Sequence, residues 1–313
     1  MRPIVQNADK KFGSTRPLFA CMALLVAACS GEQTTASSAA EQQSESAGAS
    51  ETSTASSNAG GSGFEAGSMR DLNGVWQAMS RANFDVETHH ARSALQLTDG
   101  PMGPVPDKSV VALGAVGAVP AGYGVVEGGS IPYTEDALKT RDENKANWVS
   151  RDPEIKCYLP GVPRATYLPF PFQILQNDGQ TLFVYEFANT VRNIFLDDPG
   201  EAPIDSWMGQ SYGYWDGDSF VVEVTAQNGR TWIDRAGNFT SPETKVTERF
   251  TKVDDNHIRY QATLEDPSIY TEPWTMEMTL YRLTGADAEL QEFNCVPFVE
   301  ELLYGNLRKE PVQ

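Results

Sequence analysis

Residues 212–225 read YGYWDGDSFVVEVT, and this stretch decides the fold. It contains two runs rich in aromatic and β-branched residues, Tyr212–Trp215 and Phe220–Thr225, and such residues favour strands. Asp216-Gly217-Asp218 separates the two runs, and an Asp-Gly pair supplies the positive φ angles of a tight hairpin turn. The stretch therefore predicts an antiparallel β-hairpin.

The same pattern recurs on both sides of this hairpin. Two more hairpins are expected, from Phe172–Gln176 and Leu182–Phe187 around Asn177-Asp178-Gly179, and from Val246–Val253 and Ile258–Leu264 around Asp254-Asp255-Asn256. Single strands are expected at Val191–Leu196, Trp274–Leu283 and Leu290–Val296. A succession of about eight or more antiparallel strands predicts a mainly β fold, either an up-and-down barrel or a strongly curved, calycin-like sheet.

The stretch before the hairpins predicts one helix and an extended N-terminal segment. Thr134 is a suitable helix cap with two acidic residues after it, so a helix is expected from Pro132 to about Trp148. The Gly-rich loop Gly122–Gly129 lacks the following Lys-Ser/Thr of a phosphate-binding loop, and we interpret it as an extended crossing at a barrel end. The globular composition of residues 69–313 indicates a single β-rich domain.

The N-terminus reads as an export signal. Basic residues precede an apolar segment that is too short to span a bilayer, and the segment ends in Leu25-Val26-Ala27-Ala28-Cys29. This ending resembles the lipobox of bacterial lipoproteins, which implies removal of residues 1–28 and diacylation of Cys29. Ser30 after the cysteine resembles the pattern sorted to the outer membrane of a Gram-negative cell. Residues 29–68 are rich in Ser, Ala, Gly and Glu and predict a disordered tether.

The charge of the chain argues against a nucleic-acid partner. The net charge is −18, and removal of four basic and one acidic side chain with residues 1–28 would make it −21. A phosphate backbone needs a basic surface, which no run of Lys and Arg provides here. The acyl chains on Cys29 are therefore the expected membrane contact, and no protein partner can be named from the sequence.

The cysteines agree with export to an oxidising compartment. Cys21 would leave with the signal and Cys29 would take the lipid, so Cys157 and Cys295 remain as one pair. We expect a disulfide between them, with two free buried thiols as the alternative.

Several predicted strands carry a charged residue among apolar neighbours. They are Glu186, Arg192, Glu223, Glu248 and Arg249. Because side chains alternate between the two faces of a strand, these groups lie either in a barrel lumen or on the solvent face. Carboxylates gathered in a lumen would have the shifted pKa values that acid–base chemistry uses.

Glu248 and Asp266 are accordingly the candidate acid and base, and His89 is a candidate to assist them. The histidines and cysteines show no zinc-binding spacing, and Asp216-Gly217-Asp218 is better explained as a turn than as a calcium site, so neither a metal nor another cofactor is expected.

The candidate ligand-binding groups include the charged residues Glu186, Arg192 and Arg249. They also include Trp215 and Trp232, because the rings of these residues would suit a flat ligand at a barrel mouth. Arg164, held in a proline-stiffened segment, either clamps a ligand carboxylate or pairs internally, and we favour the internal pair.

Two sets of motifs in the chain resemble those of other proteins. The order of CYLPGVPR at 157–164, GYWDGD at 213–218, TERF at 247–250, and EDP at 265–267 with Pro273-Trp274 resembles that of a group of uncharacterised exported bacterial proteins. The resemblance covers Leu72 to Arg308 and implies one continuous domain, but that group has no established activity. Gly74-x-Trp76 resembles the first-strand signature of lipocalins, although the long stretch before the hairpins departs from their plan.

Three functions remain open from the sequence. The first is a tethered barrel that binds a small apolar or aromatic compound. The second is a lyase, an isomerase or a glycoside-active hydrolase that uses Glu248 or Asp266, with Arg192 or Arg249 holding an anionic group. The third is a structural or assembly role in the envelope.

Overall fold

The computed structural model describes residues 67–91, 97–100, 103–106, 120–285, 288–299 and 302. The chain divides into two units, Met1–Asn58 and Ala59–Gln313, and every described residue belongs to the second. The predicted signal peptide, the lipidated Cys29 and the tether up to residue 66 therefore lie outside the described residues. Among the described residues, no helix combines the length and the apolar character that a membrane span requires.

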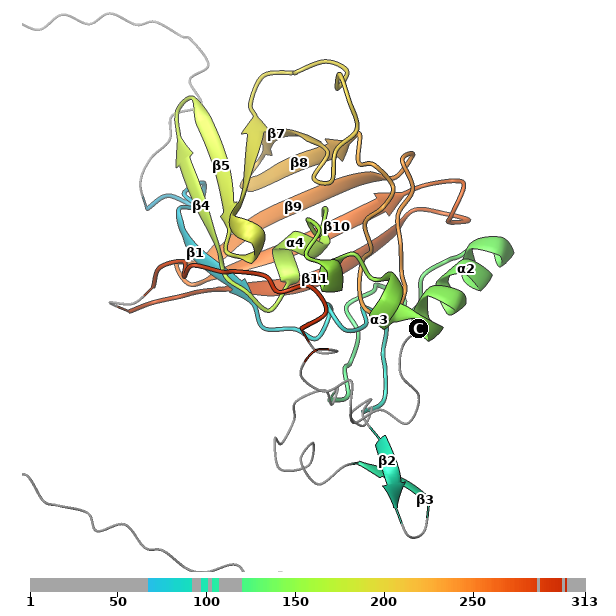
Figure 1. Cartoon of the computed structure of the whole chain (residues 1–313). Helices are drawn as coiled ribbons and strands as arrows, with labels where there is room; N and C mark the ends of the chain where they lie inside the picture. The colour runs from blue at the N-terminus through green and yellow to red at the C-terminus, as the bar shows by residue number, and fades with distance from the viewer. Residues whose placement is uncertain are drawn as a thin grey trace, which may run out of the picture. The chain divides into compact units, whose positions relative to one another are not determined.

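The mainly β prediction is confirmed, because nine strands form a closed barrel (Figure 1). In chain order the strands are β1 Gly74–Ala78, β4 Phe172–Asn177, β5 Gln180–Tyr185, β6 Thr190–Phe195, β7 Gln210–Asp216, β8 Ser219–Thr225, β9 Lys245–Asp254, β10 His257–Glu265 and β11 Trp274–Arg282. Around the ring the order is β1, β11, β10, β9, β8, β7, β6, β5 and β4, and β4 pairs with β1 to close it. All three predicted hairpins are present as β4–β5, β7–β8 and β9–β10. The short pair β2 Leu97–Gly100 and β3 Gly103–Pro106 forms a separate sheet.

One strand pair departs from the up-and-down plan. β6 and β7 run parallel and pair only through Ile194 with Ser211 and Phe195 with Tyr212. A closed ring in which neighbouring strands alternate in direction needs an even number of strands, so a ring of nine must contain a parallel pair. The chain makes this pair by the long connection of residues 196–209, because a parallel pair cannot be joined by a two-residue turn.

The core fills the inside of the barrel. Strand residues alternate between buried and exposed positions, as in β10, so alternate side chains point inward. Phe183 packs edge-on against Phe250 with ring centroids 5.2 Å apart, and Phe250 packs against Tyr260 at 5.0 Å. These three side chains are fully buried.

Short helical segments accompany the strands in the described part of the chain. They are α2 Glu135–Ala146, α3 Trp148–Arg151, α4 Arg164–Tyr167, and the 3-10 turns η1 Glu154–Lys156 and η2 Phe187–Asn189. The predicted helix is α2, and Thr134 caps it by accepting a hydrogen bond from the Ala137 N–H. All four residues of α4 are buried, and Figure 1 shows α4 across the barrel opening. The Gly-rich crossing packs beside β11, where Glu127 N–H donates to Thr275 O and Glu277 N–H donates to Val125 O.

The C-terminal part confirms one prediction and contradicts another. Cys157 and Cys295 form the predicted disulfide, with Cα atoms 5.7 Å apart, so the alternative of two free thiols is wrong. The strand predicted at Leu290–Val296 is also wrong, because these residues have no regular secondary structure. The barrel is already closed by the β4–β1 pair, so it offers this segment no free edge.

Candidate functional site

Two of the predicted charged residues meet inside the barrel. Arg192 on β6 and Glu248 on β9 both point inward, and Arg192 Nη2 lies 2.5 Å from Glu248 Oε2. Their side chains are 2% and 0% exposed. Two charges removed from water carry a large desolvation cost, which only close pairing and further hydrogen bonds can offset.

The surrounding hydroxyl groups supply those hydrogen bonds. Tyr260 donates to Glu248 Oε1 at 2.7 Å, and Thr166 of α4 donates to the same oxygen at 3.3 Å. Arg192 donates to Ser211 Oγ at 2.8 Å and to the Tyr185 hydroxyl at 3.3 Å. Burial raises the pKa of Tyr260 well above its ordinary value, and the carboxylate of Glu248 raises it further, so Tyr260 stays protonated and continues to donate.

This arrangement uses both carboxylate oxygens of Glu248. Oε1 accepts from Tyr260 and Thr166, and Oε2 accepts from Arg192. Burial by itself lowers the pKa of Arg192, but Glu248 outweighs that effect, and the pKa lies above its ordinary value. Arg192 therefore stays charged, and both oxygens of Glu248 are engaged in hydrogen bonds, which suits a core ion pair better than a proton shuttle. The acid or base role of Glu248 remains a prediction.

The other two catalytic candidates lie in separate surroundings. Asp266 accepts hydrogen bonds from the hydroxyls of Ser241, Thr244 and Ser268, each at 2.6 Å. Burial by itself raises the pKa of Asp266, but these hydrogen bonds outweigh it and the pKa lies below its ordinary value. Asp266 is therefore ionised at neutral pH and has no proton to give as an acid.

His89 packs against the backbone of the Gly-rich crossing, where it forms a β-bridge with Gly122. Its Nδ1 lies 3.2 Å from His90 O, and its Nε2 is buried without a hydrogen-bond partner in the described structure. Within the described residues, no hydrogen bond joins His89, Asp266 and Glu248 to one another. The structure therefore does not assemble them as one catalytic group.

A second buried network surrounds Arg164. Its guanidinium donates to both carboxylate oxygens of Asp152, at 2.7 and 2.9 Å, to Glu154 at 3.1 Å and to Asn83 at 2.9 Å. Arg164 is 0% exposed. The structure therefore pairs Arg164 internally and leaves it no path to a ligand carboxylate.

Glu154 extends this network to Arg235. Arg235 donates to both oxygens of Glu154, at 2.9 and 3.1 Å, and its guanidinium lies over the rings of Trp148 and Phe84. Burial by itself raises the pKa of Glu154, but Arg235 and Arg164 outweigh it, so Glu154 is ionised. Sequence reasoning missed both residues. The signal available was the pair of acids around Pro153, placed just before Cys157.

Asp234 is a further buried carboxyl beside this network. It is 0% exposed and accepts hydrogen bonds from Val86 N–H at 2.8 Å and from the Asn238 amide at 2.6 Å. Burial and the nearby Asp85 raise the pKa of Asp234 to about 7, even though its hydrogen bonds and Arg164 act in the opposite direction. Asp234 is thus a buried acid that titrates near neutral pH.

The remaining predicted ligand-binding residues are scattered. Arg249 points outward and pairs with Asp216 at 2.8 Å, and Glu186 accepts a hydrogen bond from the backbone N–H of Gln291. The Trp215 ring packs under Arg70 with 5.5 Å between the guanidinium carbon and the ring centroid. Trp232 is buried and bridges to Phe239. These residues do not form one site with Arg192 and Arg164.

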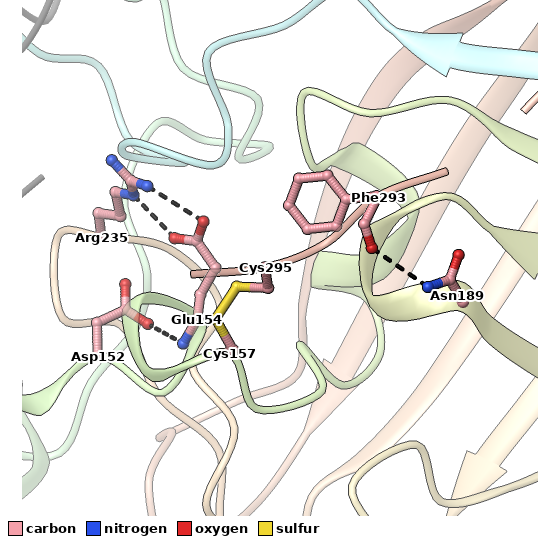
Figure 2. Close-up of a disulfide and its surroundings, with 7 residues drawn as sticks. All are labelled: Asp152, Glu154, Cys157, Asn189, Arg235, Phe293 and Cys295. Atoms are coloured by element: carbon pink, nitrogen blue, oxygen red, sulfur yellow. Dashed lines mark hydrogen bonds and ion pairs between the residues drawn. A yellow bond between two sulfur atoms is a disulfide. The ribbon is translucent and has the colours of Figure 1, made fainter. Parts of the chain in front are cut away.

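An apolar pocket lies next to the disulfide instead. Its volume is about 330 Å³, and Phe170, Phe187 and Phe293 line it together with the ion pair of Glu154 and Arg235. Figure 2 shows that ion pair on one side of the disulfide and Phe293 on the other. The volume falls at the lower end of the range for small-molecule sites, about 300–1,000 Å³. A second pocket of about 220 Å³, lined by Ser80, Arg81, Asp85 and Tyr123 among others, is smaller than that range.

Comparison with protein-family models, with curated proteins and with solved structures gave no match. In the described ranges, no group of three or more His, Cys, Asp or Glu side chains is placed to hold a metal ion. The pocket and the two buried networks are therefore the candidate site of this domain.

We predict strong coupling between Arg192 and Glu248. Arg192→Met and Glu248→Gln should each lower the free energy of unfolding by about 3–5 kcal/mol, because each leaves a buried charge unpaired. The free energy of unfolding of the double variant should fall by about 1–3 kcal/mol less than the sum of the falls in the two single variants. Urea unfolding measures the free energy of unfolding of all three variants.

The matched control is the exposed pair of Arg249 and Asp216, with the substitutions Arg249→Met and Asp216→Asn. The coupling energy of this pair should stay below about 1 kcal/mol. Additive losses at Arg192 and Glu248 would contradict the coupling.

We also predict that Asp234 makes stability depend on pH. Its carboxyl has an ordinary pKa of 3.8, and folding raises this pKa to about 7, so the folded state holds the proton more tightly. The stabilisation is therefore complete below about pH 4 and is lost as the pH rises through about 7. The neutral variant Asp234→Asn lacks this titration. The wild type should lose stability relative to Asp234→Asn between pH 4 and 8, as measured by urea unfolding.

The control for this measurement is Asp136→Asn on α2. A hydrogen bond from Lys139 lowers the pKa of Asp136, so this carboxyl does not titrate between pH 4 and 8. The stability difference between the wild type and Asp136→Asn should therefore stay constant across that range. A constant difference for Asp234→Asn as well would contradict the raised pKa of Asp234.

Proposed function

We propose that this protein is a lipid-anchored protein of the outer envelope of a Gram-negative bacterium whose β domain binds a small apolar or aromatic compound. The observation that carries the proposal is the pocket beside the disulfide, where phenylalanine side chains meet a single ion pair. A largely apolar pocket with a few convergent polar groups is the usual form of a small-molecule site.

The rings of the pocket favour a flat ligand. The Phe293 centroid lies 4.6 Å from that of Phe170 and 5.1 Å from that of Phe187, and the last two are 5.7 Å apart. Aromatic rings at such separations attract one another beyond the area they bury, and a ligand ring adds to the same cluster. The ion pair of Glu154 and Arg235 gives the pocket one polar wall, which suits a ligand with one hydrogen-bonding group.

The barrel lumen is a poorer candidate for the binding site. The inward side chains Phe183, Phe250 and Tyr260 pack on one another, and the lumen also holds the ion pair of Arg192 and Glu248. A ligand in the lumen would have to displace closely packed rings or separate the two charges. The proposal therefore places the ligand at the end of the barrel, whereas lipocalins, which the first strand resembles, enclose theirs.

We predict that filling the pocket blocks binding. The probe is N-phenyl-1-naphthylamine, a neutral aromatic amine whose fluorescence rises in apolar surroundings. The wild type should bind it saturably with a dissociation constant of the order of 10–100 µM. Val296→Trp, on the pocket wall, should weaken binding at least about tenfold, whereas Val191→Trp, on the exposed outer face of β6, should leave it unchanged. Absence of saturable binding to the wild type, or equal binding to both variants, would overturn the proposed site.

The lipid anchor has its own test. In a Gram-negative host fed labelled palmitate, the wild-type chain should incorporate label and run at its processed size on a denaturing gel. Cys29→Ser should lose the label and accumulate as precursor, because the thiol that receives the lipid is gone. Cys21→Ser, within the removed signal, should keep the label. Labelling that survives Cys29→Ser would contradict the anchor.

A further inference from the structure

The pocket beside the disulfide is built from two parts of the chain. One part comes from the barrel end and contributes Ile155, Phe170 and Phe187, with the ion pair of Glu154 and Arg235. The other part is the segment of residues 288–299, which we call the C-terminal strap. Half of the residues that line the pocket belong to the strap, among them Phe293, Cys295 and Val299. Without the strap, the barrel end has an open apolar face in place of a pocket.

The strap has few other attachments. Within the described part of the chain, three hydrogen bonds join the strap to residues that are distant in sequence. Asn189 donates to Phe293 O at 3.2 Å, Gln291 N–H donates to Glu186 at 2.9 Å, and Phe298 N–H donates to Ile155 O at 2.8 Å. The strap, drawn in red in Figure 1, forms none of the β-ladders of the barrel.

The disulfide is the one covalent attachment of the strap to the barrel end. It joins Cys295, in the middle of the strap, to Cys157, which is 138 residues away in sequence and directly follows η1. Figure 2 shows the bond between the ion-pair side of the pocket and Phe293. Both cysteine residues are partly exposed to solvent.

The two sides of this bond differ in how firmly they are held. On the Cys157 side, Asp152 and Glu154 are tied to the buried Arg164 by short ion pairs. On the Cys295 side, the Phe293 ring packs on Phe170 and Phe187, but Val296 and Phe298 are exposed and contribute little buried area. Breaking the disulfide should therefore leave the barrel end in place and release the strap, because the strap then keeps only the ring contacts of Phe293 and a few hydrogen bonds.

We infer that the Cys157–Cys295 disulfide is a redox latch, which keeps the strap closed over the ligand pocket when oxidised and lets it open when reduced. This inference rests on the proposed function for its ligand. The partner it requires is a dithiol reductant. One reductant thiolate attacks a sulfur of the disulfide and forms a mixed disulfide, and the second reductant thiol then displaces the protein sulfur. Two electrons and two protons pass to the protein, which leaves two cysteine thiols and an oxidised reductant.

The test compares the oxidised protein, the protein reduced with dithiothreitol, and the variant Cys157→Ser/Cys295→Ser. Binding of N-phenyl-1-naphthylamine reports the pocket, and hydrogen exchange of backbone amides reports the strap and the barrel separately. Reduction should weaken binding at least about tenfold and speed exchange at residues 288–299 at least about tenfold. Exchange in β9 and β10 should stay unchanged, and reoxidation should restore both properties. The double variant should behave as the reduced protein and should not respond to dithiothreitol.

Each other outcome has a separate meaning. If the oxidised protein does not bind the probe, the proposed site fails, and strap exchange alone then decides the latch. If the oxidised and reduced proteins bind equally, or if strap exchange does not change, the latch is overturned while the proposed function stands. If reduction also speeds exchange throughout β9 and β10, the disulfide supports the whole fold and the latch is overturned.

Discussion

The buried guanidinium of Arg164 is the interaction on which the pocket end of this domain depends. It joins α4 to two other parts of the chain, since it binds Asp152 and Glu154 before the disulfide and Asn83 from the N-terminal region. Arg164 also begins α4, which closes the barrel opening and places Thr166 on Glu248. One side chain thus fixes the helix that covers the lumen and the acid that forms the polar wall of the pocket.

The two buried ion-pair networks do different work. A buried ion pair contributes little net stability compared with apolar side chains of the same volume, because desolvation cancels most of the attraction. The pair of Arg192 and Glu248 is saturated by hydroxyl groups and is closed to solvent. The pair of Glu154 and Arg235 lies at a pocket wall, and the Arg235 side chain keeps 17% of its surface exposed. Only the second pair can therefore meet a ligand without disruption of the core.

The sequence predicts the regular parts of this fold because local chemistry specifies them. Asp-Gly and Asp-Asn turns mark the hairpins, and Thr134 marks the start of α2. The parallel pair of β6 and β7 has no local signal, since it follows from the closure of a nine-stranded ring. The charges in the apolar strands are visible in the sequence, but the pairing of Arg192 with Glu248 depends on strands 56 residues apart. Glu154 lies in the three-residue turn η1 and Arg235 in an irregular segment, and neither is long enough for a periodicity that marks a residue as buried.

The strand predicted at Leu290–Val296 is absent for the same reason that the pocket exists, which is closure of the barrel by β4 and β1. An apolar segment that follows the last strand of an open sheet can extend the sheet, and the sequence gives no sign that β4 and β1 have already closed it. With no edge to pair with, the segment keeps its backbone out of the ladder and packs its side chains on the barrel end. Such a segment needs another attachment, and the disulfide supplies it. Closure of the barrel therefore leaves the packed core inside and this segment outside, where the segment forms one wall of the pocket. A disulfide holds that wall, and such a bond depends on an oxidising environment.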